Sequence, residues 1–150
     1  MKALLRKLTL LLGVLCLNAP IAFAANGWDD DYDKALAKAK AENKMVVLDF
    51  TGSDWCGWCM KLDKEVFSKK EFKDYAKENL VLVEVDFPRG KNQSKKLKEQ
   101  NEKLKNEHSV SGYPTIIVLN SEGKKVGQLG YMAGGPAPFV EKLNALKAKP

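Results

Sequence analysis

The sequence predicts an α/β fold with a four-stranded mixed central sheet and helices on both faces. Short runs of aliphatic and β-branched residues alternate with segments of helical spacing, which is the pattern of strands connected by helices. The last two strand-like runs are joined by turn-forming residues, 120–124, which predict an antiparallel hairpin after a parallel half. The length of 150 residues, with 45% hydrophobic and 29% charged side chains, indicates one globular domain and excludes collagen-like or largely disordered chains.

The N-terminus has the pattern of a secretory signal peptide. Three basic residues within the first seven precede an apolar run at 8–17, and a small-x-small triplet, Ala-Phe-Ala, follows at 22–24. Because this run is too short for a permanent membrane span of about 20 residues, we expect residues 1–24 to be cleaved off after Ala24, with an uncleaved anchor as the alternative. The domain would then comprise residues 25–150, and the loss of three cations lowers the net charge from +6 to +3.

The first half of the domain predicts helix, strand, helix and strand in that order. Acidic residues at 29–31 precede apolar residues at helical spacing, which indicates a helix ending near Asn43. Residues 45–50 and 80–86 are short apolar runs rich in β-branched side chains, as expected for buried strands. The helical segment between them would form a right-handed crossover, and a capping box at 68–71 would restart its helix.

The second half predicts helix, strand, strand and helix. Residues 91–108 are highly polar, with Leu97 and Leu104 as their only apolar side chains, and predict an exposed, weakly amphipathic helix. The lysines of this segment are interleaved with glutamates and lack aromatic partners, which favours a solvated face over nucleic-acid binding. Residues 115–119 and 125–129 flank the hairpin turn, and apolar residues at helical spacing then predict a closing helix.

The sharpest motif is the Cys-Gly-Trp-Cys sequence at 56–59. Without the leader these two cysteines are the only ones left, and thiols three residues apart at the first turn of a helix can close a small disulfide ring. Unpaired N–H groups at a helix N-terminus favour a thiolate, so Cys56 is the candidate nucleophile. Cys59 lies one turn inside and would resolve a mixed disulfide formed at Cys56.

Two alternatives remain for this cysteine pair. One is a static structural disulfide, although so small a ring constrains the unfolded chain little. The other is a metal site, although one cysteine pair and the single histidine, His108, supply fewer than the three or four protein ligands of usual zinc sites unless a dimer shares ligands.

Asp49 is an anomaly within the predicted strand at 45–50. A buried carboxylate is costly unless it is hydrogen-bonded or protonated, so we expect a raised pKa for this side chain. Asp49 lies seven residues before Cys56 and is a candidate acceptor for the proton of Cys59. The alternative is that Asp49 faces outward or hydrogen-bonds the turn that follows the strand.

Three motifs together resemble the thioredoxin superfamily: Val-Leu-Asp-Phe at 47–50, Trp-Cys-Gly-Trp-Cys at 55–59, and Gly-Tyr-Pro-Thr at 112–115. The chain is most similar to exported thioredoxin-like proteins with a WCGWC active site and to the soluble end domain of membrane thiol reductases. The resemblance implies a thioredoxin fold, a cis Pro114, and a Tyr113 backbone that pairs with an extended substrate segment. The substrate-contacting residues that it implies are Trp55, Gly57, Trp58, Tyr113 and Pro114.

The sequence departs from thioredoxin at three points. Trp58 stands where thioredoxin has proline, which leaves the reduction potential open. The turn at 51–54 is one residue longer, and the strand at 81–85 has no lysine to pair with Asp49.

The expected function is that of an exported thiol–disulfide oxidoreductase that reduces disulfides of client proteins in the periplasm or an equivalent space. The Cys56–Cys59 pair carries the electrons, so no bound cofactor is expected, and a membrane thiol donor or partner thioredoxin would re-reduce it. We expect a monomer and no nucleic-acid partner. The alternatives are a disulfide oxidase or isomerase, and a non-enzymatic module that binds a client or Cu(I).

Overall fold

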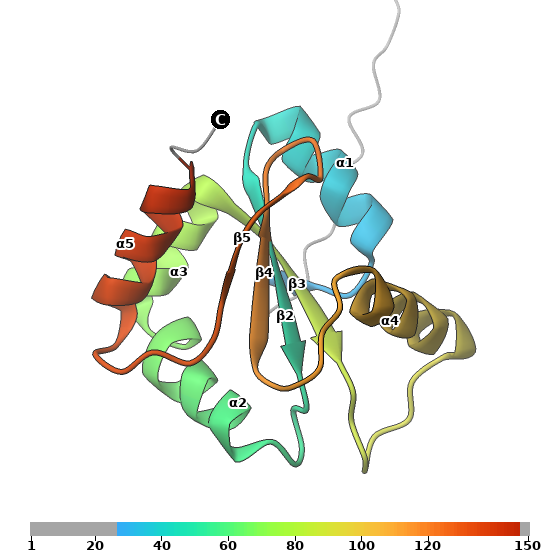
Figure 1. Cartoon of the computed structure of the whole chain (residues 1–150). Helices are drawn as coiled ribbons and strands as arrows, with labels where there is room; N and C mark the ends of the chain where they lie inside the picture. Colours follow the sequence, from blue (N-terminus) through green and yellow to red (C-terminus); the bar gives the residue numbers. More distant parts are fainter. Residues whose placement is uncertain (1–26, 148–150) are drawn as a thin grey trace, which may run out of the picture.

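The computed structural model describes residues 27–147 as a mixed sheet with helices on both faces (Figure 1). The strands are β1 (Trp28–Asp29), β2 (Met45–Thr51), β3 (Leu80–Asp86), β4 (Thr115–Leu119) and β5 (Lys125–Leu129). The helices are α1 (Tyr32–Glu42), α2 (Gly57–Leu62), the π-helical segment η1 (Asp63–Phe67), α3 (Lys70–Asn79), α4 (Lys95–Glu107) and α5 (Pro136–Lys147).

The expected signal peptide and its cleavage site lie outside the described residues. Within residues 27–147, no helix combines the length and the apolar character that crossing a membrane requires.

The sheet has five strands in the order β1-β3-β2-β4-β5, one more than the sequence predicts. β1, β3 and β2 are parallel, and β4 and β5 add an antiparallel hairpin to β2. The extra strand is β1, in which Trp28 and Asp29 pair with Leu82 and Val83 of β3. A two-residue strand has no readable side-chain alternation, which is why the sequence pattern missed it.

The two faces of the sheet carry separate cores because side chains alternate along β2 and β3. Val46, Leu48 and Phe50 point to the face covered by α1 and α4. Met45 and Val47 point to the opposite face, which is covered by α2, η1, α3 and α5. Asp49 follows this alternation and therefore belongs to the second face, on the same side of the sheet as α2.

The first helix and its ends confirm the sequence prediction. The Asp31 side chain accepts a hydrogen bond from the backbone N–H of Lys34 at 3.1 Å and caps the N-terminus of α1. Asn43 ends the helix in the left-handed conformation, with φ of 51°.

The predicted capping box at 68–71 is wrong. Ser68 donates its hydroxyl hydrogen bond to the Asp63 carboxylate at 3.0 Å, and the N-cap of α3 is Lys69, which makes no side-chain capping bond. The cause is η1: its wider turn ends at Phe67 and brings Asp63 and Ser68 together across five positions.

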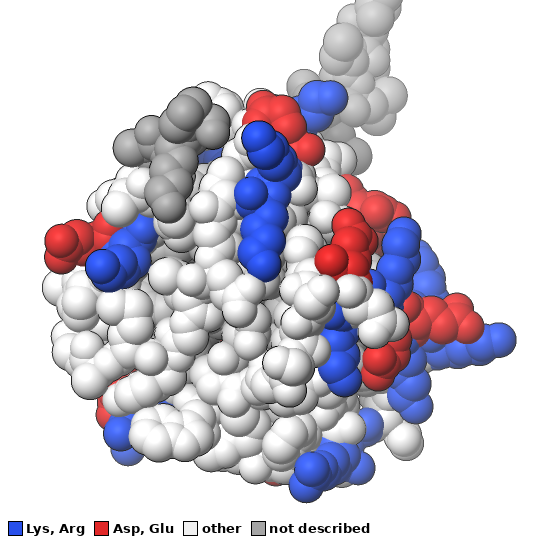
Figure 2. All heavy atoms as spheres, in the orientation of Figure 1, with Lys and Arg blue, Asp and Glu red and all other residues white. Residues whose placement is uncertain are grey.

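Helix α4 is attached to the sheet through two buried side chains. Leu104 is 1% exposed, and the Asn101 amide donates to the backbone carbonyl of Asp86 at 2.9 Å. Figure 2 shows charged side chains of both signs gathered over α4; the face over β4 and β5 carries basic side chains in its upper part and is largely uncharged below. The outer face of α4 is solvated as predicted, and its inner face is anchored more firmly than the polar sequence indicates.

Candidate functional site

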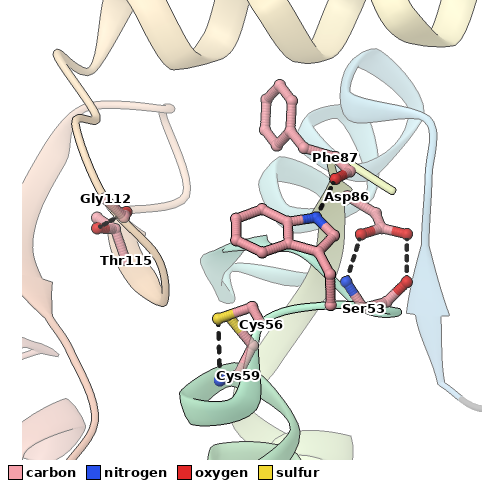
Figure 3. The surroundings of a disulfide bond; sticks show 8 residues. Ser53, Cys56, Cys59, Asp86, Phe87, Gly112 and Thr115 are labelled. Atoms are coloured by element: carbon pink, nitrogen blue, oxygen red, sulfur yellow. Dashed lines mark hydrogen bonds between the residues drawn. A yellow bond between two sulfur atoms is a disulfide. The ribbon is translucent and has the colours of Figure 1, made fainter. Parts of the chain in front are cut away.

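Cys56 and Cys59 form a disulfide where the chain passes from β2 into α2. The backbone N–H groups of Trp55 and Cys56 both donate to the Gly52 carbonyl, at 3.1 and 2.8 Å, which closes the turn that leads to the first cysteine. Cys56 is the N-cap of α2, and its sulfur accepts a hydrogen bond from the backbone N–H of Cys59 at 3.2 Å (Figure 3). Both cysteines are largely buried, with 7% and 6% exposed.

The hydrogen bond to the Cys56 sulfur gives the pair an asymmetric chemistry. In the dithiol form, a negative charge on this sulfur would face the N–H groups of the first turn and the positive end of the helix dipole. The Cys59 sulfur lies one turn further along and lacks this position. The geometry therefore suits Cys56 for nucleophilic attack and Cys59 for resolution.

Trp55 is fixed beside the disulfide by three contacts. Its indole N–H donates to the Phe87 carbonyl at 2.8 Å (Figure 3). Its ring packs edge-on against Tyr113, with centroids 5.8 Å apart, and the Arg89 guanidinium lies 4.0 Å from its centre. A Cβ at residue 52 would lie 2.6 Å from the Trp55 indole nitrogen, so only Gly52 leaves room for the ring.

The loop before β4 packs against Trp55 and extends the same wall of the site. The peptide bond between Tyr113 and Pro114 is cis, and the Thr115 hydroxyl donates to the Gly112 carbonyl at 2.8 Å (Figure 3). The Tyr113 ring also packs on Phe87, with centroids 5.3 Å apart. Trp55, Tyr113 and Phe87 thus form a continuous aromatic wall on one side of the cysteines.

Trp58 stands on the other side of the cysteines and is 58% exposed. Its ring lies 5.0 Å from the ring of Tyr131, and the Lys61 ammonium sits 5.0 Å from the centres of both rings. The Tyr131 hydroxyl donates to Glu65 at 2.6 Å, which holds this second aromatic cluster in place. Gly57 has no atom within 4 Å of where a Cβ would be, so the surface between Trp55 and Trp58 is open.

The sequence motifs did not reveal Phe87, Arg89 or Tyr131. These residues come from loops after β3 and β5, where no spacing rule relates them to the cysteines. The only available signal is that aromatic and basic side chains follow strands whose ends meet at the same edge of the sheet as the Cys56 turn.

Asp49 lines a cavity of about 390 Å³ together with Cys59. Its Oδ1 atom is buried and has no hydrogen-bond partner among the described residues. Burial raises the pKa of this carboxyl well above its usual value, and the charge of Glu84 raises it further. The raised pKa expected for Asp49 is therefore present, and its side chain faces the cavity, not the outer surface.

No group of three or more His, Cys, Asp and Glu residues within positions 27–147 is arranged to hold a metal ion. His108 ends α4 and meets Phe50 edge-on, with ring centroids 6.2 Å apart. Since Phe50 belongs to the face under α1 and α4, the histidine lies across the sheet from Asp49 and η1.

Comparison with known proteins agrees with this geometry. Residues 32–147 match the thioredoxin-like domain family. The disulfide bond reductase DsbH of Chlamydia pneumoniae is 39% identical over 131 residues, which cover 87% of this chain and 78% of that protein. The thioredoxin-related protein DsbJ of the same organism is 34% identical over 103 residues, which cover 69% of this chain but only 30% of that protein.

Solved structures show the same fold. The DsbH oxidoreductase structure superposes with a TM-score of 0.77 at 38% identity, covering 90% of this chain and 94% of that chain. The oxidised C-terminal domain of Neisseria meningitidis DsbD has a TM-score of 0.55 at 20% identity, covering 75% of this chain and 90% of that chain, and supports the fold alone. The chain therefore belongs to the thioredoxin-like domain family.

Proposed function

We propose that this protein is an exported thiol–disulfide oxidoreductase that reduces disulfide bonds of client proteins. The observation that carries the proposal is the Cys56 sulfur at the N-cap of α2, where it accepts the Cys59 backbone N–H. This position stabilises the thiolate that must attack a client disulfide. The 39% identity to a protein named a disulfide bond reductase supports the direction of electron flow.

The reaction proceeds in two exchanges. The Cys56 thiolate attacks one sulfur of the client disulfide, a mixed disulfide forms, and the other client sulfur leaves as a thiolate that takes a proton from solvent. The Cys59 thiol then gives its proton to Asp49 and attacks the Cys56 sulfur. The mixed disulfide breaks, the second client sulfur leaves, and the Cys56–Cys59 disulfide closes; two electrons have passed to the client.

The walls of the site are suited to an extended client segment. The Tyr113 backbone lies before β4 and would hydrogen-bond the segment in the manner of an added strand, next to Pro114. Trp55 and the exposed Trp58 would contact client side chains on either side of the cystine, and Gly57 would leave room for the client backbone.

The cysteine pair carries the electrons itself, so the proposed reaction uses no bound cofactor. A membrane thiol donor or a partner thioredoxin would re-reduce the pair, because exported compartments are oxidising. The signal-peptide pattern at 1–24 supports export to the periplasm or an equivalent space. We propose that the protein works as a monomer.

Substitution Cys59→Ser tests the proposal by removing the resolving thiol. Incubation of reduced C59S with extracts of the exported compartment should yield client proteins joined covalently to Cys56 and released by a reducing agent. The matched control is Cys56→Ser, which keeps Cys59 and should trap far fewer clients. Clients that co-purify only noncovalently with both variants would contradict the proposal and favour a binding module.

A further inference from the structure

Two carboxylates stand side by side beneath the resolving cysteine. Asp49 of β2 and Glu84 of β3 are register partners in adjacent parallel strands, so their side chains project from neighbouring positions on the same face of the sheet (strands in Figure 1). That face is the one covered by α2, η1, α3 and α5. A like-charged pair at this register is unfavourable for packing alone, because neighbouring acids on adjacent strands repel.

The cavity connects this pair both to the chemistry and to the surface. Asp49, Glu84 and Cys59 all line its volume of about 390 Å³, which is much larger than the ~30 Å³ that one water occupies in the liquid. Its lining also includes the exposed residues Met60 and Lys73. The cavity therefore joins the resolving cysteine and both carboxylates in one space that is open to solvent.

The charged and titratable groups that face the pair come from several elements. They are Asp30 before α1, Cys59 of α2, Asp63 of η1, Lys73 of α3, Asp86 of β3 and Lys91 after β3. Burial raises the pKa of Asp49 first of all, and among the charges Glu84 has the largest effect. Burial and Asp86 also raise the pKa of Glu84, against the opposing effect of Lys91.

A carboxylate of ordinary strength is a poor proton acceptor for a thiol. Free thiols have a pKa of about 8.5 and aspartates of about 3.9, so transfer from one to the other is strongly uphill. Two carboxylates that share a buried site bind one proton far more tightly than either would alone. A second carboxylate beside Asp49 therefore reduces the difference in pKa between the Cys59 thiol, which donates the proton, and Asp49, which accepts it.

We propose that Glu84 is a positioning residue for the resolving step: its charge, beside Asp49 in the cavity, raises the affinity of Asp49 for the proton that the Cys59 thiol releases. The inference rests on the proposed thiol–disulfide exchange. Cys59 loses its proton to Asp49, its sulfur bonds to Cys56, and the bond between Cys56 and the client sulfur breaks. The Asp49–Glu84 pair then holds one proton, which it returns to solvent through the cavity.

The test is the pH dependence of resolution, measured by stopped flow with the aromatic disulfide reagent DTNB. Attack by Cys56 on DTNB releases a first TNB anion, and attack by Cys59 on the resulting mixed disulfide releases a second. In wild type, the rate of the second release should rise with pH at a midpoint set by the pair. In Glu84→Gln this midpoint should move to lower pH by about one unit or more, because the neighbouring charge is gone.

The matched control is Glu102→Gln, which removes one negative charge from the exposed face of α4. The midpoint pH of Glu102→Gln should coincide with that of wild type. The conservative variant Glu84→Asp keeps the negative charge, so its midpoint should lie much closer to wild type than that of Glu84→Gln. An unchanged midpoint in a folded Glu84→Gln variant overturns the inference. Failure of wild type to release the second TNB at any pH overturns the proposed function instead.

A measurement on wild type covers the case in which Glu84→Gln does not fold. Carbon-13 NMR of the side-chain carboxyl groups should show the Asp49 and Glu84 resonances responding to the same two protonation steps, as expected of a coupled pair. Independent single-step titrations of the two carboxyl groups would overturn the inference without any substitution.

Discussion

Gly52 determines where the Trp55 ring lies, because a side chain at residue 52 would occupy the space of the indole. Substitution Gly52→Ala should displace the ring, break its hydrogen bond to Phe87, and cost about 1–3 kcal/mol of unfolding free energy. The matched control is Gly57→Ala, where no atom lies within 4 Å of the new Cβ and stability should stay within about 0.5 kcal/mol of wild type. Urea denaturation followed by circular dichroism checks both, and equal losses would contradict the packing argument.

Asp49 makes stability depend on pH. Its ordinary pKa is 3.8 and its pKa in the folded protein is raised, so between the two values the folded state holds a proton that the unfolded chain has lost. Stability therefore falls as pH rises through this window, by at most about 1.4 kcal/mol per pH unit. Below the window Asp49 is protonated in both states and contributes no such loss.

Asp49→Asn should remove this pH-dependent loss, because the amide is neutral at every pH. The variant should match wild type near pH 3.8 and exceed it increasingly at higher pH, while its second TNB release slows. Urea unfolding at a series of pH values measures the difference. Parallel stability curves for the two proteins would show that burial of the Asp49 charge costs nothing.

Helix α4 shows what a sequence pattern can and cannot predict at the scale of one element. The polar sequence predicted the helix and its solvated face. It did not indicate which of the two leucines, Leu97 or Leu104, is the more deeply buried, because both have the same side chain and similar polar neighbours. The packing of α4 on the sheet determines this difference: Leu104 is 1% exposed, whereas Leu97 is only partly buried. β1 was missed for a different reason, since a strand of two residues is too short to show a side-chain pattern.

The two leucines of α4 should differ in their effect on stability. Leu104→Ala leaves a cavity against the sheet and should cost about 2–5 kcal/mol. Leu97→Ala, the matched control, should cost about 1 kcal/mol or less because solvent already reaches its side chain. Thermal unfolding of the oxidised proteins provides the comparison, and a larger loss for Leu97→Ala would mean that α4 is anchored differently.

At the scale of the whole molecule, the sequence was sufficient to predict the fold class and the disulfide pair. The apolar, β-branched runs at 45–50 and 80–86 and the Cys-Gly-Trp-Cys motif are local signals, and they predicted the buried strands β2 and β3 and the disulfide at the start of α2. The aromatic walls and the Asp49–Glu84 pair depend on strand order and loop placement, which only the assembled structure brings together. Nothing in the sequence distinguishes Glu84 from other acidic residues, because only the pairing of β3 with β2 places it beside Asp49.

The reduction potential of the Cys56–Cys59 pair tests the central claim most directly. The oxidised protein is equilibrated in thiol/disulfide buffers of defined potential, and the fraction reduced is followed by thiol titration. If the protein is a reductase, the reduction potential of the pair should lie near that of thioredoxin, about −270 mV. A value near about −120 mV, typical of a disulfide donor, or a pair that does not exchange at all, would contradict it.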